Sequence, residues 1–356
     1  MDHANQAARQ SKSSAEPINS PKINLLPKTP GSSARLKGLG AAVGIAIAAM
    51  ALLALTHALK HVDYGQVFAI VGQTPGGVII LALMLVACSY ASLTLYDLLA
   101  LRTIGRTDVP YRIAALASFT SYPIAHGIGA VALISPVIRY RIYSRNGLGA
   151  VDVANICFLT GLTFWLGNLT ALGLSLFYEP DAISLMDYLP AQLTRVMAVV
   201  LLLGIVAFLV WSWRSPRSLG TRRWPVRLPS GPMVVLQIAI GVFDLGAAAL
   251  AMYMLIPAGL NIDFLRLTTV FIAATLLGFA SHTPAGIGVF DAAILLGLGG
   301  DDDKEPLIAA LLMFRLLYHF LPFVIALGLF GAVEGWRSLR PKPAVSALLR
   351  KITPAN

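Results

Sequence analysis

The sequence predicts an all-α, polytopic integral membrane protein: a helical bundle with an inverted repeat and two re-entrant helical hairpins. Hydrophobic residues make up 57% of the chain and charged residues only 12%, and the mean hydropathy is +0.74. Several apolar stretches reach the roughly 20 residues that a helix needs to cross a bilayer. Two further apolar stretches are interrupted by proline and glycine, in SYPIAHGIGA (121–130) and SHTPAGIGVF (281–290).

Residues 1–37 are polar and rich in Ser, Pro and Lys, a composition that predicts a disordered segment. This segment is too long and polar for the n-region of a signal peptide, so the first apolar stretch is expected to remain as a helix. A membrane domain is predicted over 38–336, followed by a basic tail, 337–356. The uninterrupted spans expected within the domain are 38–59, 76–101, 151–178, 191–213, 231–257 and 306–335. Residues 214–230 are expected to form a short basic loop.

The distribution of charge predicts the topology, because Lys and Arg are enriched in cytoplasmic loops. Of the 27 basic residues, 22 fall in the leader, in the connections near 102–112, 139–145 and 214–227, and in the tail. The remaining connections carry mainly acidic residues, such as DDDKE at 301–305. Both termini are therefore expected in the cytoplasm of a multi-pass protein of the inner (plasma) membrane.

This alternation holds only if the two interrupted segments turn back within the membrane. Segment 112–138 has basic connections on both sides and is predicted to enter from the cytoplasm and return there. Segment 264–299 has acidic connections on both sides and is predicted to enter from outside and return outside. Proline and glycine at membrane depth are tolerated where protein or a polar cavity surrounds them. The residues assigned to the hairpin tips are Ser121, Pro123, Gly127, Gly129, Ser281, Pro284, Gly286 and Gly288.

The two halves of the domain align at an offset of 159 residues, which places Gly127-Ile128-Gly129 on Gly286-Ile287-Gly288. The alignment predicts one repeat at about 76–178 and a second at about 231–335. The charge pattern gives them opposite orientations. Glycine- or proline-interrupted segments in corresponding halves indicate a transporter's midplane site. The alternative is that these small residues only allow helices to pack closely.

Ionisable residues inside predicted spans are candidates for a translocation path. Asp244 lies near the middle of 231–257, and Asp291 follows the second Gly-x-Gly. Arg315 lies about ten residues into 306–335, so it is expected to pair with Asp291 or Asp244. A buried structural ion pair is the alternative role. Asp97, near a span end, is expected to extend toward water.

Arg139 and Arg141 follow the tip of the first hairpin, where guanidinium groups could bind a lipid phosphate. Membrane anchoring under the positive-inside rule is the alternative. His126 and His282 lie in the two tip regions and could couple lipid movement to protons, or simply line a cavity.

Other function classes are not favoured. The net charge of +10 is explained by topology rather than by nucleic-acid binding. The six histidines are scattered, so no metal site or other cofactor is expected, and no P-loop indicates ATP as the energy source. Cys88 and Cys157 both lie in apolar segments, which argues against a disulfide framework.

Three stretches resemble the membrane domain of the lysyl-phosphatidylglycerol synthase/flippase family, the multiple peptide resistance factor. They are VIRYRIYSRNGLGAVDVANICFLTGLTFWLG (137–167), TPAGIGVFDAAILLG (283–297) and LLMFRLLYHFLPFVIAL (311–327). The resemblance covers roughly 40–335 and implies movement of aminoacylated phosphatidylglycerol between leaflets. In that family a C-terminal cytosolic domain makes the lipid, and the present sequence ends at Asn356 without it. The chain is therefore expected to be a stand-alone form with no catalytic chemistry.

The expected function is that of a flippase for an anionic or aminoacylated phospholipid. Membrane phospholipid is the expected partner, with a separate lipid-modifying enzyme or a second copy of the chain as further partners. The alternatives are a secondary transporter of a small anionic solute, a translocator of a polyprenyl-linked or hopanoid lipid, and a non-transporting scaffold. A polar cavity that opens sideways to lipid would favour the lipid substrates, whereas a sealed one would favour a solute.

Overall fold

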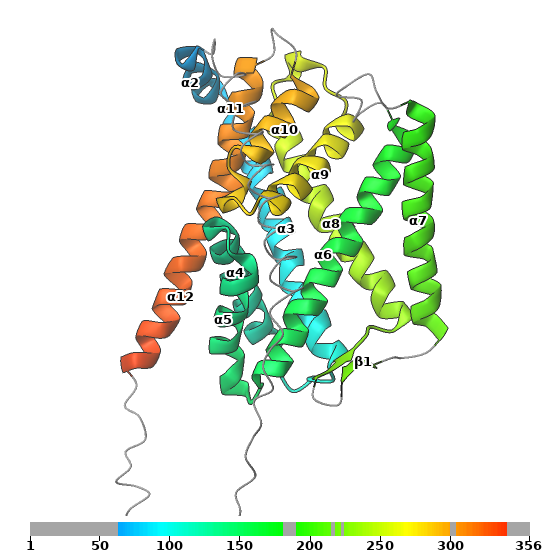
Figure 1. The fold of residues 1–356 in the computed structure, drawn as a ribbon. Coiled ribbons are helices and arrows are strands. Elements are labelled where there is room, and N and C mark those ends of the chain that lie inside the picture. The colour runs from blue at the N-terminus through cyan, green and yellow to red at the C-terminus, as the bar shows by residue number, and fades with distance from the viewer. Residues whose placement is uncertain (1–62, 181–189, 215–217, 222–223, 300–303, 340–356) are drawn as a thin grey trace, which may run out of the picture. The chain divides into compact units, whose positions relative to one another are not determined.

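The computed structural model describes residues 63–339, except for 181–189, 215–217, 222–223 and 300–303 (Figure 1). The predicted N-terminal segment 1–37, the first predicted span 38–59 and residues 340–356 of the tail lie outside the described residues. Every described residue belongs to one unit of the chain, Val43–Asn356.

The described residues are mainly helical, which confirms the predicted fold class. Their helices are α2 (Tyr64–Gln73), α3 (Gly76–Thr103), α4 (Tyr111–Ile128), α5 (Val131–Tyr143), η1 (Ser144–Asn146), α6 (Ala150–Tyr178), α7 (Ala191–Arg214), α8 (Gly231–Leu255), η3 (Ala258–Leu260), α9 (Phe264–Ser281), η4 (Pro284–Gly286), α10 (Val289–Leu298), α11 (Lys304–Phe314), the π-helical η5 (Arg315–Phe320) and α12 (Leu321–Leu339). Among the described residues, six helical segments are long and apolar enough to cross a membrane.

Two short strands lie in the segment that was expected to be only a basic loop. Strands β1 (Ser218–Thr221) and β2 (Trp224–Arg227) pair antiparallel, with Leu219 opposite Val226. The alternation of apolar and polar residues in this stretch is too brief to be distinguished from a loop in the sequence.

Both interrupted segments form helical hairpins, as predicted. In the first, α4 and α5 are joined by Gly129 and Ala130, and Gly129 has a φ of 79° that a residue with a Cβ rarely adopts. In the second, α9 and α10 are joined by a longer turn over His282–Gly288 that contains η4. Figure 1 shows one hairpin in the lower half of the bundle and the other in the upper half, with their turns facing each other.

Two residues assigned to the first tip lie elsewhere. Ser121 and Pro123 are buried inside α4 and precede the turn at Gly129. Proline removes one helical hydrogen bond but does not end the helix here. The hydroxyls of Thr120 and Ser121 donate to carbonyls of the preceding turn, Leu116 O at 2.6 Å and Ser118 O at 3.3 Å. Neither hydroxyl bonds to Phe119 O, the carbonyl that Pro123 leaves without its helical donor.

Side-chain contacts tie the connections at each end of the bundle together. At the lower end in Figure 1, Arg106 donates to the carbonyls of Asn146 and Gly147, across the α3–α4 and α5–α6 connections. Its hydrogen bonds to Asp108 hold the pKa of that carboxyl below its usual range. At the upper end, the backbone N–H of Asp63 donates to Glu305. The basic and acidic connections therefore lie at opposite ends.

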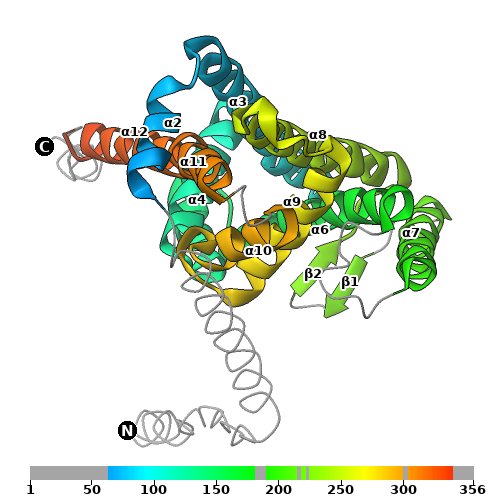
Figure 2. The same cartoon turned by 90° about the horizontal axis from the view of Figure 1, so that it is seen from above.

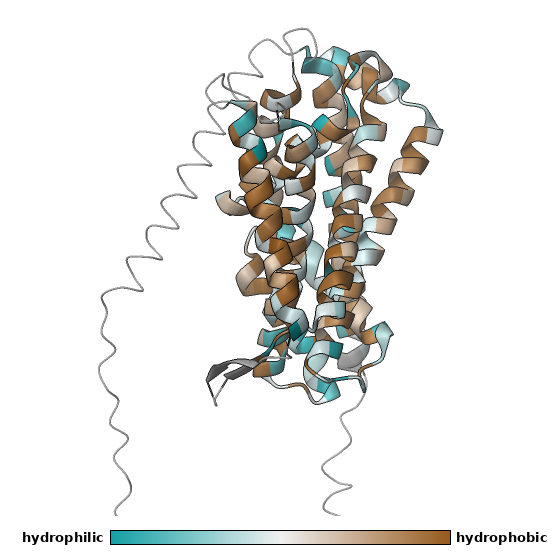
Figure 3. Cartoon of the chain, turned by 90° about the vertical axis from the view of Figure 1, so that its right-hand side faces the viewer, coloured by the Kyte–Doolittle hydropathy of each residue, from teal (hydrophilic) through white to brown (hydrophobic). Residues whose placement is uncertain are grey.

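The order of elements gives the inverted repeat. Helix α3, the α4–α5 hairpin and α6 form one copy, and α8, the α9–α10 hairpin and the α11–η5–α12 segment form the other. Helix α7 connects the two copies and lies at the edge of the bundle when it is viewed from above (Figure 2). Helices α6 and α8 cross closely at two glycines, Gly167 and Gly241. A Cβ added to Gly167 would lie only 2.5 Å from Gly241 Cα. Many large apolar side chains are exposed, among them Phe68, Leu133 and Val200, and Figure 3 shows hydrophobic residues along the helices.

Candidate functional site

The two hairpin tips touch each other. A Cβ added to Gly129 would lie 2.8 Å from the backbone nitrogen of Pro284 and 3.1 Å from the carbonyl oxygen of His282. Only a glycine allows the backbones to approach this closely. Gly129 and His282 are 153 residues apart in the sequence. The two hairpin tips therefore form one contact inside the bundle.

A groove of about 670 Å³ lies beside this contact. Helices α4, α5 and α6 provide most of its lining, and the second hairpin contributes Gly278, Phe279, His282 and Thr283. Polar and small groups from Ser118, Thr160 and Gly161 lie among apolar ones along its length. The groove follows the first hairpin from the tip to Arg139.

The groove opens toward the apolar surface of the bundle. Leu133 on α5 is 74% exposed, and Phe158 and Trp165 on α6 are 49% and 48% exposed. In a membrane protein, exposed apolar side chains at helix depth face lipid. Among the described residues, the groove is therefore open to the side of the bundle, between α5 and α6.

Arg139, at one end of the groove, is buried and paired. Its Nε and Nη2 donate to the carboxylate of Asp97 at 2.8–3.3 Å, and it also donates to Ser135. Tyr143 OH donates to the same carboxylate at 2.7 Å. Asp97 is fully buried, so the expectation that it extends toward water is wrong. Its charge is balanced by Arg139 instead.

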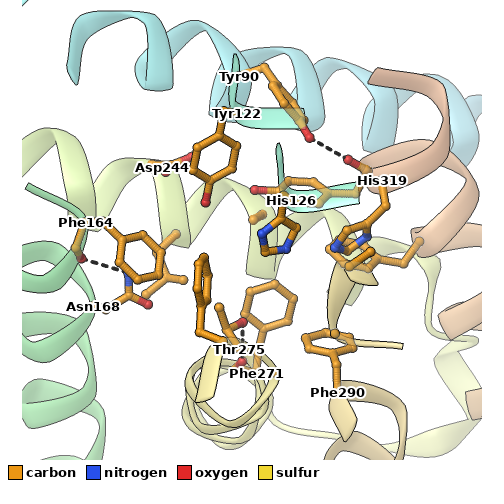
Figure 4. Close-up of a pocket in the computed structure, with 18 residues that line it drawn as sticks. Tyr90, Tyr122, His126, Phe164, Asn168, Asp244, Phe271, Thr275, Phe290 and His319 are labelled. Carbon is orange, nitrogen blue, oxygen red and sulfur yellow. Dashed lines mark hydrogen bonds between the residues drawn. The ribbon is translucent and has the colours of Figure 1, made fainter. Parts of the chain in front are cut away.

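A second, smaller cavity of about 60 Å³ lies deeper in the bundle (Figure 4). The groove and this cavity share Tyr122, His126, Phe164, Gly278 and Phe279 in their linings. Those side chains therefore separate the lipid-facing groove from the interior. The cavity has room for a few water molecules or a small hydrated ion.

Asp244 on α8 is the acidic residue of this cavity. Ser89 Oγ donates to its Oδ1 at 2.5 Å, and Tyr96 OH donates to its Oδ2 at 3.0 Å. Tyr318 OH lies 3.1 Å from Ser89 Oγ and extends the network to the π-helical segment. Arg315 does not pair with Asp244, although the sequence left this pairing open.

Two histidines meet in the cavity. The rings of His126 on α4 and His319 on η5 are stacked with centroids 5.8 Å apart, and the ring of Tyr122 stacks with that of His126 at the same centroid distance. His282, the other predicted histidine, caps α9 in the left-handed conformation and its Nδ1 lies 3.0 Å from Ala280 O. It lines the groove rather than the cavity.

Arg315 pairs with Asp291, one of its two expected partners. Its Nε and Nη2 donate to the two carboxylate oxygens at 2.6 and 2.7 Å. Two further bonds reach the carbonyls of Ala285 and Gly286 in the second tip. Asp291 also accepts from the backbone N–H of Gly288 at the start of α10. This arrangement fixes the geometry of the second tip.

Arg141 lies apart from these sites. It is exposed and donates to Glu334 of α12 at 2.6 Å. Among the described residues, no group of three or more His, Cys, Asp or Glu side chains has the geometry of a metal site.

The sequence did not single out Ser89, Tyr96, Tyr318 or His319. A signal for the last two was present, since Arg315, Tyr318 and His319 are spaced i, i+3 and i+4 and share one helical face. Ser89 and Tyr96 are spaced i, i+7 and also lie on one face. Nothing in the sequence indicated that these two faces meet at Asp244.

No family model matches the chain. The chain is 28% identical over 313 residues to an uncharacterized protein of Synechocystis sp.. This alignment covers 85% of the present chain and 94% of that protein. The chain is also 28% identical over 277 residues to the inner membrane protein YbhN of Escherichia coli. That alignment covers 75% of the present chain and 84% of YbhN.

Similarity also extends to phosphatidylglycerol lysyltransferases. The protein of this name from Staphylococcus haemolyticus is 25% identical over 283 residues, which are 77% of this chain but 31% of that protein. The chain therefore spans about a third of the lysyltransferase. These matches agree with the family resemblance found in the three motifs. The identities of 25–28% indicate distant relatives.

Proposed function

We propose that this protein is a phospholipid translocator of the inner membrane, and that lipid headgroups move along the groove beside the first hairpin. The observation that carries this proposal is the side opening of the groove, where the apolar side chains of Leu133, Phe158 and Trp165 are exposed. A flippase has to shield a polar headgroup while the acyl chains stay in the bilayer. An opening toward lipid meets this requirement, whereas a solute carrier needs a path to water at each end.

The lining of the groove agrees with a polar headgroup and apolar chains. Ser118, Thr160 and the tip backbone offer polar groups inside, and the aromatic and aliphatic residues stand at the opening. Arg139 is committed to Asp97, so we assign it to the structure of the groove rather than to direct phosphate binding. An anionic or aminoacylated phospholipid is the proposed cargo, which the similarity to phosphatidylglycerol lysyltransferases and to an inner membrane protein supports.

Leaflet exchange in proteoliposomes tests the proposal. Purified protein is reconstituted with fluorescent phosphatidylglycerol, its lysylated form or phosphatidylethanolamine, and dye in the outer leaflet is quenched chemically over time. Exchange faster than in protein-free vesicles is expected for at least one headgroup. Equal rates with and without protein for all three lipids would overturn the proposal for these cargoes.

The groove can be blocked without removing an ion pair. Gly161 lines the groove, and a Cβ placed on it meets no atom within 4 Å, so Gly161→Trp should fill empty space. Gly204 on α7 is equally open but lies away from the groove, which makes Gly204→Trp the matched control. Exchange is expected to fall severalfold in the first variant and to remain in the second.

The proposed reaction makes and breaks no covalent bond. Lipid recovered from the vesicles should therefore have an unchanged mass and headgroup composition by mass spectrometry. Appearance of a modified headgroup, in the absence of any other protein, would assign a catalytic activity instead.

A further inference from the structure

Asp244 differs from the other acidic residues inside the bundle in the way its charge is balanced. Asp97 receives a guanidinium from Arg139, and Asp291 receives one from Arg315. Asp244 is 7% exposed, and within the described part of the chain no Lys, Arg or His lies within ion-pair distance of it. It accepts hydrogen bonds from the hydroxyls of Ser89 and Tyr96 instead. An ionised carboxylate that is removed from water requires a compensating positive charge.

The surroundings of Asp244 do not supply that charge from another side chain. Helix α3 contributes Tyr90 and Tyr96, α4 contributes Tyr122 and His126, and η5 contributes Tyr318 and His319 as the titratable groups around the cavity. Helices α6, α9 and α11 contribute Asn168, Thr275 and aromatic rings to its lining. Arg315, the nearest guanidinium along η5, is bound to Asp291.

The cavity presents unpartnered hydrogen-bonding atoms as well. Asn168 is 2% exposed, and its amide nitrogen donates to Phe164 O, whereas its Oδ1 has no hydrogen-bond partner. Nδ1 of His319 is likewise buried without a partner. Buried polar atoms without partners are uncommon and mark sites for water, ions or ligands. An amide oxygen and a carboxylate that face one small space together favour a cation over an anion.

We propose that Asp244 binds one small monovalent cation, a proton or Na⁺, in the cavity behind the hairpin tips. The volume of about 60 Å³ has room for such an ion together with a few water molecules. The bound charge neutralises Asp244, and Ser89 and Tyr96 orient the carboxylate for it. Residues that line both the ion site and the groove, such as Tyr122 and His126, lie between the two. The next step rests on the proposed lipid movement. Occupancy of the site can then influence how the tips pack.

Infrared difference spectroscopy on the purified full chain tests the proposal without any transport. A protonated aspartic acid in an apolar site gives a carbonyl band that ¹³C labelling of the aspartate carboxyl displaces. The band is recorded from pH 5 to pH 9.5 in choline chloride, and then at fixed pH with added NaCl or KCl. Loss of the band with rising pH, whatever the salt, identifies the ion as a proton. Loss on addition of NaCl but not KCl identifies it as Na⁺.

Variants assign the band and keep the test valid if one of them fails to fold. Asp244→Asn should remove the band, whereas Asp263→Asn, at the exposed N-terminus of α9, should leave it unchanged. Ser89→Ala keeps the carboxylate but removes a donor to its ionised form, so the band should persist to higher pH. A band unaffected by both Asp244→Asn and Ser89→Ala overturns the assignment.

Two other results also overturn the proposal. A band that stays constant over the whole range would make Asp244 a permanently neutral acid, and the absence of any band under all salts would make it permanently ionised. The spectroscopic result is independent of leaflet exchange. If the Asp244 band responds but the protein moves no tested lipid, the ion site is retained and the proposed cargo is rejected. If the protein exchanges lipid but the Asp244 band does not respond, the proposed function is retained and the ion site is rejected.

Discussion

Arg315 holds Asp291 through two hydrogen bonds of 2.6 and 2.7 Å, and the same guanidinium donates to the carbonyls of Ala285 and Gly286. One side chain at the start of the π-helical segment thereby joins the α11–α12 span to both the turn and the second helix of the second hairpin. π-Helical turns often occur at functional sites, and this one also places Tyr318 and His319 at the central cavity.

Removing one partner of this pair should destabilise the protein. Arg315→Gln leaves Asp291 without its cation, and Asp291→Asn leaves Arg315 without its anion. Because the two side chains are 18% and 15% exposed, we expect a loss of roughly 2 kcal/mol for each. The midpoint of thermal unfolding in detergent, followed by tryptophan fluorescence, measures the effect. The double variant should lose less than the sum of the two single losses, and full additivity would contradict a direct interaction.

The base of the first hairpin should depend on Asp97 in the same way. Asp97→Asn leaves a buried guanidinium at Arg139 without a counter-charge, for which we expect a cost of about 3 kcal/mol. The exposed pair of Arg141 and Glu334 provides the control, since Arg141→Gln should change stability by less than about 1 kcal/mol. Equal effects of the two substitutions on thermal unfolding would contradict the assigned roles.

The helical class, the hairpins and the inverted repeat followed from the sequence, because each leaves a regular signal. The length of an apolar stretch identifies a span. Basic and acidic connections have to alternate between the two sides of the membrane, and they do so only if 112–138 and 264–299 form hairpins. Interior partners leave no such signal. Asp97 and Arg139 are 42 residues apart, and nothing in either stretch specifies that the two side chains meet. The position of Asp97 near the end of a predicted span led to the wrong expectation that it extends to water.

Local strain was also difficult to locate from sequence. Pro123 was assigned to a tip because proline ends most helices, but α4 continues past it to Ile128. The π-helical segment 315–320 contains no proline or glycine itself, but Pro322 lies two residues beyond it. Pro322 has no N–H to donate to Tyr318 O, which accepts from Tyr90 OH at 2.9 Å instead, so the proline was a sequence signal that the prediction did not use.

The contact between the tips should be sensitive to a single methyl group. Gly129→Ala places a Cβ 2.8 Å from the backbone nitrogen of Pro284 and requires a left-handed alanine. The backbone conformation alone costs about 1–2 kcal/mol. Gly204→Ala, in a helix with no atom within 4 Å of its Cβ, should instead be neutral or slightly stabilising. Unfolding of the two variants in parallel makes the comparison, and an unaffected Gly129→Ala protein would contradict a rigid contact.

Labelling of single cysteines can establish which end of the bundle faces the cytoplasm. In a background with Cys88→Ser and Cys157→Ser, Arg145→Cys reports on the lower end of Figure 1 and Asn261→Cys on the upper end. Both positions are exposed. Because basic connections favour the cytoplasm, a membrane-impermeant maleimide added to intact cells should label Asn261→Cys, and should label Arg145→Cys only after permeabilisation.

If Arg145→Cys is labelled from outside and Asn261→Cys is not, the bundle is inserted the other way up. The first hairpin would then open to the outside, and the groove would begin in the outer leaflet. Labelling of both positions in intact cells would contradict the placement of the two connections on opposite sides of the membrane, and with it the inverted orientation of the two repeats.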